Sequence, residues 1–309
     1  MQPKEKSKNS MKLLVTGAFG QAKNHIAELT GMGHEVFFMQ QEAGELPVPA
    51  AQIEGIIGNG IFLSHPIEEF TSLRYIQLTS AGFDRVPMDF VRANGIEIYN
   101  ARGVYSIPIA ETVICGVLEL YRGGASYVRQ QDKKLWEKNR NLRELCGSTV
   151  GVVGCGSVGT ECAKRFKAFG CEIIGIDVKP YESEHYDRML GFENLDEILG
   201  VADITVVTAP LTDETYHMFD KRRIGLMKKG AILINVSRGA LVCTKALEEA
   251  LDAGLYGAVL DVFEEEPLDA SSQLWTMPNV IITPHSSFIG GGNAQRLWQV
   301  IQSNLKKYS

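Results

Sequence analysis

The sequence predicts an α/β protein built from two parallel-sheet domains, and three observations lead to this prediction. Short apolar runs typical of strands alternate with amphipathic stretches typical of helices, which is the pattern of βαβ units. The runs fall into two series, the first from Met11 to about Gly103 and the second from Thr149 to His285. A chain of 309 residues, 45% of them hydrophobic, is also long enough to form two cores.

The first series contains five candidate strands, which lie at residues 12–18, 34–40, 53–59, 73–82 and 96–103. The first strand leads into a turn with Gly17 and Gly20, but this turn has no third glycine. No acidic residue ends the next strand either. We therefore interpret the turn as an ordinary strand-to-helix connection.

Residues 106–130 predict one long helix between the two series, because apolar residues recur at helical spacing and Pro108 stands near its start. The tail, residues 293–308, predicts a further amphipathic helix. We expect this tail to pack on the first domain. The domains would then comprise residues 11–103 plus 286–309, and residues 104–285. Residues 1–10 are polar and lysine-rich, so we expect disorder there and no signal peptide.

The second series contains six candidate strands, at residues 149–156, 171–177, 202–210, 230–239, 257–263 and 279–285. The first of these runs directly into Gly154-x-Gly156-x-x-Gly159, and the second ends in Asp177. The three glycines permit a tight turn, close approach of a pyrophosphate and close helix packing, in that order. The following helix N-terminus offers free N–H groups and a positive dipole end.

This strand, turn, helix, strand and acid together predict a dinucleotide site rather than a glycine turn used for packing alone. Asp177 stands close to the ~20-residue spacing at which an acid binds the adenosine ribose. Its charge would repel a 2′-phosphate, so the sequence favours NAD over NADP, although Lys179 argues slightly the other way.

Polar residues follow the later strands, where ligands bind in an open parallel sheet. Arginine, glutamate and histidine suit hydride transfer between a nicotinamide and a 2-oxo acid. Arginine holds a carboxylate bidentately, histidine exchanges a proton near neutral pH, and a neighbouring carboxylate orients the ring. The strand-end residues are Thr208, Ala209, Pro210, Ser237, Arg238, Glu264, Glu265, Glu266 and His285.

Each of these residues also has a simpler interpretation. Arg238 alone could be a surface or helix-cap arginine, and His285 could simply end a strand. The glutamates could form a solvated loop, and for Glu264 and Glu265 we expect that they do. Three complementary groups at successive strand ends, beside a nucleotide pattern, favour chemistry.

Composition excludes several classes of protein. The net charge of −6 gives no basic surface for nucleic acid or anionic lipid. Six cysteines show neither paired CxxC spacing nor the density of a disulfide-stapled domain, so we expect a cytoplasmic protein with free thiols. No apolar run reaches the ~18 residues of a membrane span, and no ligand spacing predicts a metal.

Motifs along nearly the whole chain from Met11 resemble those of the D-isomer-specific 2-hydroxyacid dehydrogenases. The resemblance rests on "GVVGCGSVG" with its later aspartate, "TAPLTDET", "INVSRGALV", "LDVFEEEPL" and "ITPHSS". "LTSAGFDRVP" and "NARGVYSIPIAE" are similar to the family's substrate-loop and interdomain segments. The resemblance implies two Rossmann-like domains, with the NAD-binding domain inserted into a discontinuous flavodoxin-like substrate domain and the active site in the cleft. It also implies a homodimer.

The resemblance also implies roles for individual residues. The family's catalytic arginine, glutamate and histidine fall on Arg238, Glu266 and His285. Predicted cofactor contacts are Gly154, Gly156, Ser157, Val158, Gly159, Asp177, Thr208, Ala209, Pro210, Val236, Ser237, Asp261 and His285. Predicted substrate contacts are Ser80, Ala81, Gly82 and Phe83, whose backbone N–H groups would hold a carboxylate, with Phe62, Tyr105 and Arg238.

The substrate implied is a small or apolar 2-oxo acid. Family members that act on 3-phosphoglycerate carry basic residues in the turn after the third strand, whereas here this turn has Ile61, Phe62 and Leu63. Phe62, Phe83 and Tyr105 could equally be packing residues. Tyr105 also stands where the family commonly has a polar residue. Two other functions remain open, a formate- or phosphite-type dehydrogenase and a non-catalytic dinucleotide sensor of the corepressor type.

Overall fold

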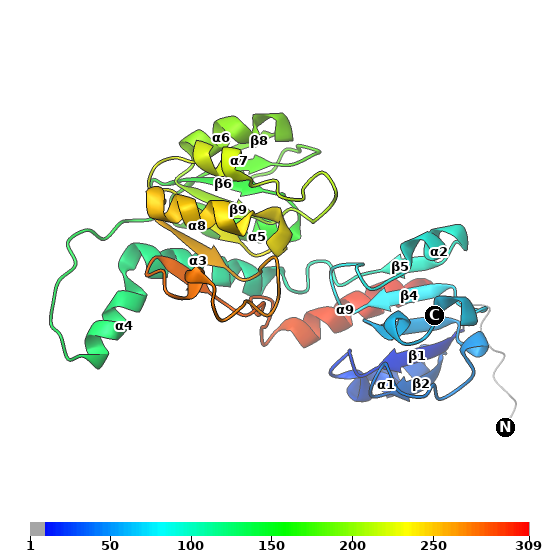
Figure 1. The fold of residues 1–309 in the computed structure, drawn as a ribbon. Coiled ribbons are helices and arrows are strands. Elements are labelled where there is room, and N and C mark those ends of the chain that lie inside the picture. The colour runs from blue at the N-terminus through cyan, green and yellow to red at the C-terminus, as the bar shows by residue number, and fades with distance from the viewer. Residues whose placement is uncertain (1–9, 309) are drawn as a thin grey trace, which may run out of the picture. The chain divides into compact units, whose positions relative to one another are not determined.

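The computed structural model describes residues 10–308, which form two compact units (Figure 1). One unit comprises the residues up to Tyr105 together with those from Gly290 onward, and the other comprises Ser106–Ile289. The predicted disorder of residues 1–10 concerns residues that, apart from Ser10, lie outside the described part of the chain. Within residues 10–308, no helix has the length and apolar character needed to cross a bilayer.

The first unit contains a five-stranded parallel sheet in the order β2-β1-β3-β4-β5. This is the flavodoxin-like order, and it confirms the five predicted strands and the predicted fold class. The strands are β1 (Lys12–Thr16), β2 (Glu35–Met39), β3 (Gly55–Gly58), β4 (Tyr75–Leu78) and β5 (Glu97–Tyr99). The helices are α1 (Ala22–Gly31), α2 (Met88–Ala93) and α9 (Asn293–Leu305).

The last helix of the chain packs on this first sheet, as the red ribbon beside the blue and cyan strands shows (Figure 1). Leu297 and Ile301 of α9 are buried with Leu13 and Val15 of β1, because alternate residues of a strand face the same side of the sheet. Leu14 belongs to the core on the other face. The N-terminal and C-terminal parts of the chain therefore share one core.

The second unit contains a seven-stranded parallel sheet in the order β12-β11-β10-β9-β6-β7-β8. The order reverses between β6 and β9, as in a dinucleotide-binding Rossmann sheet. The strands are β6 (Thr149–Val153), β7 (Glu172–Ile176), β8 (Arg188–Leu190), β9 (Ile204–Val207), β10 (Ile232–Asn235), β11 (Gly257–Leu260) and β12 (Val280–Ile282). Strand β8 was not predicted, because three residues beginning with Arg188 form no apolar run.

Helices cover both faces of this second sheet (Figure 1). They are α3 (Ser106–Arg122), α5 (Ser157–Ala168), α6 (Leu195–Val201), α7 (Lys221–Leu226) and α8 (Thr244–Ala253). Buried side chains of α3 and α5, such as Val113 and Phe166, share one core, while Leu199 and Leu247 share the other.

The prediction of one continuous helix over residues 106–130 is wrong. Helix α3 ends at Arg122, Gly123 adopts a left-handed φ of +69°, and α4 (Gly124–Asp132) then begins. Glycine reaches this backbone region without steric cost, so it breaks a helix whose side-chain periodicity continues. The two helices differ in burial, since α4 has no buried residue.

Candidate active site

The glycine turn after β6 is packed tightly on one side and open on another. A Cβ at Gly154, which has φ +92°, would collide with the backbone of Ala209, and one at Gly159 would collide with the carbonyl of Gly154. A Cβ at Gly156 would meet nothing within 4 Å. Two of the glycines therefore serve packing, while the third leaves room beside the backbone.

Helix α5 begins at Ser157 without a side-chain cap, since its N-cap residue is Gly156. The first N–H groups of a helix have no acceptor within it, so those of Ser157 and Val158 suit a phosphate oxygen. These features together fit the pyrophosphate of a dinucleotide.

Asp177 follows β7 directly and is oriented by the same turn. Its carboxylate accepts hydrogen bonds from the N–H of Cys155 (2.8 Å) and of Lys179 (3.1 Å). A carboxylate has about four acceptor positions, so two remain for the hydroxyl groups of a ribose.

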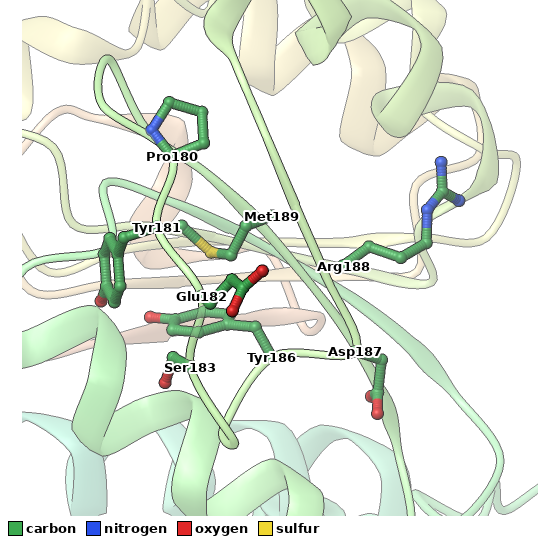
Figure 2. Close-up of a pocket in the computed structure, with 8 residues that line it drawn as sticks. All are labelled: Pro180, Tyr181, Glu182, Ser183, Tyr186, Asp187, Arg188 and Met189. Atoms are coloured by element: carbon green, nitrogen blue, oxygen red, sulfur yellow. The ribbon is translucent and has the colours of Figure 1, made fainter.

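The segment that follows Asp177 lines a pocket of about 370 Å³, and the lining residues lie between Pro180 and Met189 (Figure 2). Tyr181 donates a hydrogen bond from its hydroxyl to the carbonyl of Cys155 (2.7 Å), and its ring packs edge-to-face with buried Tyr186. Burial raises the pKa of the Cys155 thiol to about 12. Neither tyrosine is predicted from the sequence, where their only signal is their position just after the acid.

Hydrogen bonds from Thr208 and Ser237 join the loops that follow β6, β9 and β10. The hydroxyl of Thr208 donates to the carbonyl of Gly154, and the hydroxyl of Ser237 donates to the carbonyl of Ala209. Both hydroxyl protons are therefore used to join neighbouring loops. Val236, beside Ser237, is buried.

The structure brings Glu266 and His285 together. Oε2 of Glu266 lies 2.8 Å from Nδ1 of His285, and Oε1 accepts a hydrogen bond from the N–H of Phe263 (3.0 Å). Both side chains are partly exposed, with accessible fractions of 36% for Glu266 and 44% for His285. The carboxylate thus orients the imidazole through Nδ1, while the site stays open to solvent.

Arg238 lies in the loop after β10, and the next residue, Gly239, packs against the loop that carries the glutamates. A Cβ at Gly239 would collide with the backbone of Phe263 and Glu264, so the arginine loop and the glutamate loop are in direct contact. The guanidinium of Arg238 donates to the carbonyl of Ser237 (2.8 Å). Glycine at 239 is therefore what allows the two loops to approach.

Asp261 is buried, and both its carboxylate and its carbonyl hold the turn that carries His285. Its carboxylate accepts from the hydroxyl of Thr283 (2.6 Å) and from the N–H groups of Ser286 (2.9 Å) and Ser287 (3.0 Å). Its carbonyl accepts from the N–H of His285 (2.8 Å), whose φ is +49°. Asp261 fixes an otherwise unfavourable backbone conformation at His285.

The expectation that Glu264 is merely solvated is wrong. Its carboxylate lies 2.5 Å from Nε2 of His217 and accepts from the N–H of Thr244 (2.8 Å). Burial raises the pKa of Glu264, but these hydrogen bonds outweigh it, so the pKa lies below its ordinary value. Glu264 and His217 are 47 residues apart, and no local pattern could have paired them.

The predicted carboxylate-binding loop lies in the first unit, after β4. The Ser80 hydroxyl donates to the carbonyl of Gly82 (3.0 Å), and the Asn100 amide donates to the carbonyl of Ala81 (2.6 Å). Among residues 10–308, the N–H groups of Ala81, Gly82 and Phe83 have no hydrogen-bond acceptor. The loop is thus held by its oxygens and presents its donors.

Phe62 and Tyr105 both contact other residues of this unit. Phe62 packs edge-to-face on buried Phe70 with ring centroids 5.8 Å apart. The hydroxyl of Tyr105 donates to the carbonyl of Thr79, and burial raises the pKa of Tyr105. Phe83, in contrast, is exposed.

No group of three or more potential metal ligands occurs within residues 10–308.

Comparison with known proteins agrees with this geometry. Residues 114–287 match the family model described as "D-isomer specific 2-hydroxyacid dehydrogenase, NAD binding domain". The chain is 38% identical over 246 residues to the D-3-phosphoglycerate dehydrogenase of Methanocaldococcus jannaschii, covering 78% of this chain and 46% of that protein. It is 34% identical over 245 residues to the glyoxylate reductase of Thermofilum pendens, covering 76% and 71%.

A similar fold occurs in the crystal structure of a D-isomer specific 2-hydroxyacid dehydrogenase family protein from Aeromonas salmonicida. The two chains are 28% identical, the match covers 97% of this chain and 96% of the other, and the TM-score is 0.82.

Proposed function

The chain belongs to the D-isomer specific 2-hydroxyacid dehydrogenase family, and from this premise we propose that it interconverts a small 2-oxo acid and its D-2-hydroxy acid with NAD(H). The observation that carries the proposal is the Glu266–His285 pair, which lies at the strand ends beside the loop of Arg238.

His285 is the proposed acid and base. Because Nδ1 is engaged by Glu266, Nε2 is the ring nitrogen that gives a proton to the carbonyl oxygen or takes it from the hydroxyl. Glu266 stabilises the protonated ring and fixes its orientation. Arg238 binds the carboxylate and polarises the carbonyl. In the first unit, the N–H groups of Ala81, Gly82 and Phe83 are donors that also suit a carboxylate.

The cofactor would be held by the glycine turn and the start of α5. Gly156 leaves room for the pyrophosphate, the N–H groups of Ser157 and Val158 bind its oxygens, and Asp177 accepts from the ribose. The bound nicotinamide supplies or accepts the hydride.

The proposed substrate carries an uncharged group beyond its carbonyl, as glyoxylate and hydroxypyruvate do. The turn after β3 contains no lysine or arginine between Gly58 and Pro66, so it has no lysine or arginine of its own to bind a phosphate. The name of one relative, glyoxylate reductase, agrees with this choice. A 3-phosphoglycerate substrate fits this turn less well, although another relative carries that name.

We also propose that the protein is a cytoplasmic homodimer. Val128 and Trp136, in and just after α4, are 59% and 96% exposed, beside the partly exposed side chains of Tyr127 and Leu135. Such a cluster of apolar side chains marks a protein contact, and homodimers are the commonest oligomers. All six cysteines are free thiols, which suits a reducing compartment.

An assay of NADH absorbance with a panel of 2-oxo acids tests the function. We expect oxidation of NADH with glyoxylate, hydroxypyruvate or a bulkier uncharged acid. His285→Ala should lower turnover by a factor of about 10² while NADH binding, followed by fluorescence, stays nearly intact. Binding of NADH without turnover of any acid would favour the dinucleotide sensor. Reduction of NAD with formate or phosphite instead would favour that type of dehydrogenase.

A further inference from the structure

The first unit has its own ligand-binding position, defined by the order of its strands. The sheet order β2-β1-β3-β4-β5 reverses between β1 and β3, and ligands of such sheets bind beyond the carboxyl ends of these two strands. Here those ends are Thr16, at the end of β1, and Gly58, at the end of β3.

The side chain of Glu42 occupies this position. Its Oε1 accepts hydrogen bonds from the hydroxyl of Thr16 (2.8 Å) and the N–H of Asn59 (2.6 Å), and its Oε2 accepts from the N–H of Gly60 (2.7 Å). A Cβ at Gly58 would lie 2.7 Å from Oε1, so glycine makes room for the carboxylate.

The arrangement is that of an anion site with the anion supplied by the chain itself. Two successive backbone N–H groups that converge on one acceptor form an anion-binding concavity. The Cδ of Arg85 also lies 3.6 Å from where a Cβ of Gly60 would be, and Arg85 has no hydrogen bond or ion pair among residues 10–308. Without Glu42, two N–H groups would face an incoming anion, with the side chain of Arg85 close by.

We propose that Glu42 is a specificity-determining residue, which excludes 2-oxo acids with a second anionic group and so selects those with an uncharged one. This proposal rests on the proposed function. The carboxylate engages both N–H donors and adds a like charge, and repulsion of the unwanted partner is an established route to specificity. Arg85 does not reverse this effect, because Glu42 fills the position to which an anion would bind.

The test is the selectivity of Glu42→Gln, which removes the charge and keeps the shape. Specificity constants with NADH are measured for hydroxypyruvate and for 3-sulfopyruvate or 3-phosphooxypyruvate. The wild-type protein should prefer the uncharged acid, and Glu42→Gln should reduce that preference by about tenfold or more, chiefly through the KM of the anionic acid. The substrate preference is the ratio of two specificity constants measured on the same protein, so it does not depend on the fraction of that protein that is folded.

Thr16→Val is the matched control. It removes one hydrogen bond to the same carboxylate and leaves the charge in place. We expect its substrate preference to equal that of the wild type. An unchanged preference in Glu42→Gln, or an equal change in Thr16→Val, would overturn the proposal and leave Glu42 with a structural role only.

A second measurement does not depend on turnover. Inorganic phosphate should raise the melting temperature of Glu42→Gln by more than that of the wild type, because a ligand that binds the folded state stabilises it and the start of α5 is the same in both proteins. Equal shifts in both proteins would contradict the proposal. If the wild type reduces no 2-oxo acid but the phosphate shift is larger in the variant, the proposed function fails and the anion-excluding role of Glu42 stands.

Discussion

The adjacent glutamates 264–266 have three different environments, although they are the same residue type in one short run. Glu264 is held by His217 and Thr244, and Glu266 by Phe263 and His285. Glu265 makes no hydrogen bond or ion pair with the described residues. The role of each glutamate therefore depends on the residues that folding brings into contact with it, and not on its residue type or its place in the run.

Glutamine substitutions separate the roles of these neighbours. Glu266→Gln should lower turnover by a factor of about 10², because a neutral amide no longer stabilises the protonated His285. Glu265→Gln is the control and should behave as the wild type in steady-state kinetics across pH. Loss of activity in Glu265→Gln but not in Glu266→Gln would show that the catalytic glutamate is assigned to the wrong residue.

At the scale of elements, the C-terminal helix is held on the first sheet by polar contacts as well as by its apolar face. The Asn304 amide donates to the side chain of Gln77 (2.8 Å), and the Arg296 guanidinium donates to the carbonyl of Val104 (2.7 Å). Beyond α9, in the short 3-10 helix η7 (Lys306–Tyr308), Lys307 pairs with Glu97 of β5. These contacts fix the register of the helix against the sheet.

The Glu97–Lys307 pair predicts how acid affects this docking. The hydrogen bond from Lys307, together with one from Tyr99, lowers the pKa of Glu97 to about 2. A lowered pKa contributes stability above its unfolded value of about 4.5, and this contribution is lost as the pH falls through about 2. The effect should be small, because the pair is exposed.

Urea unfolding between pH 2 and 7 measures this contribution. Lys307→Met should be less stable than the wild type at neutral pH and equally stable near pH 2. In a Glu97→Gln background the same substitution should show no such pH dependence. A stability difference that persists at pH 2 would mean that Lys307 acts through packing and not through its charge.

The break at Gly123 gives α4 a different role from α3. Helix α3 packs its apolar face within its own unit, whereas α4 and the segment after it stand away from the sheet of that unit (Figure 1). The proposed dimer would cover the exposed apolar side chains there. The periodicity of apolar residues alone could not show that α3 has buried residues while α4 has none.

Trp136→Glu tests that surface. The wild type should be a dimer by light scattering at micromolar concentration, and the variant should be a monomer, because a charge in an apolar contact loses its hydration. Trp275→Glu is the control, since Trp275 is also exposed, at 51%, but lies in another part of the same unit. A monomeric wild type, or a Trp136→Glu dimer of unchanged affinity, would contradict the proposed interface.

At the scale of the whole molecule, the sequence predicted what local patterns encode. Apolar runs marked most strands, and the glycine spacing marked the turn before α5, because both depend on neighbours in the chain. The buried carboxylate of Asp261 and the His217–Glu264 pair could not be predicted, since each joins segments that only folding brings together. The same holds for Glu42, which precedes its partners Asn59 and Gly60 by 17 and 18 residues.

The discontinuity of the first unit has a consequence for biosynthesis. Its sheet is translated before residues 106–289, but Leu297, Ile301 and the rest of α9, which complete its core, are translated after them. All residues of the inserted unit, Ser106–Ile289, are available before then. The second domain to be translated is therefore the first that can finish folding, while the nascent first domain must wait with one face of its sheet uncovered.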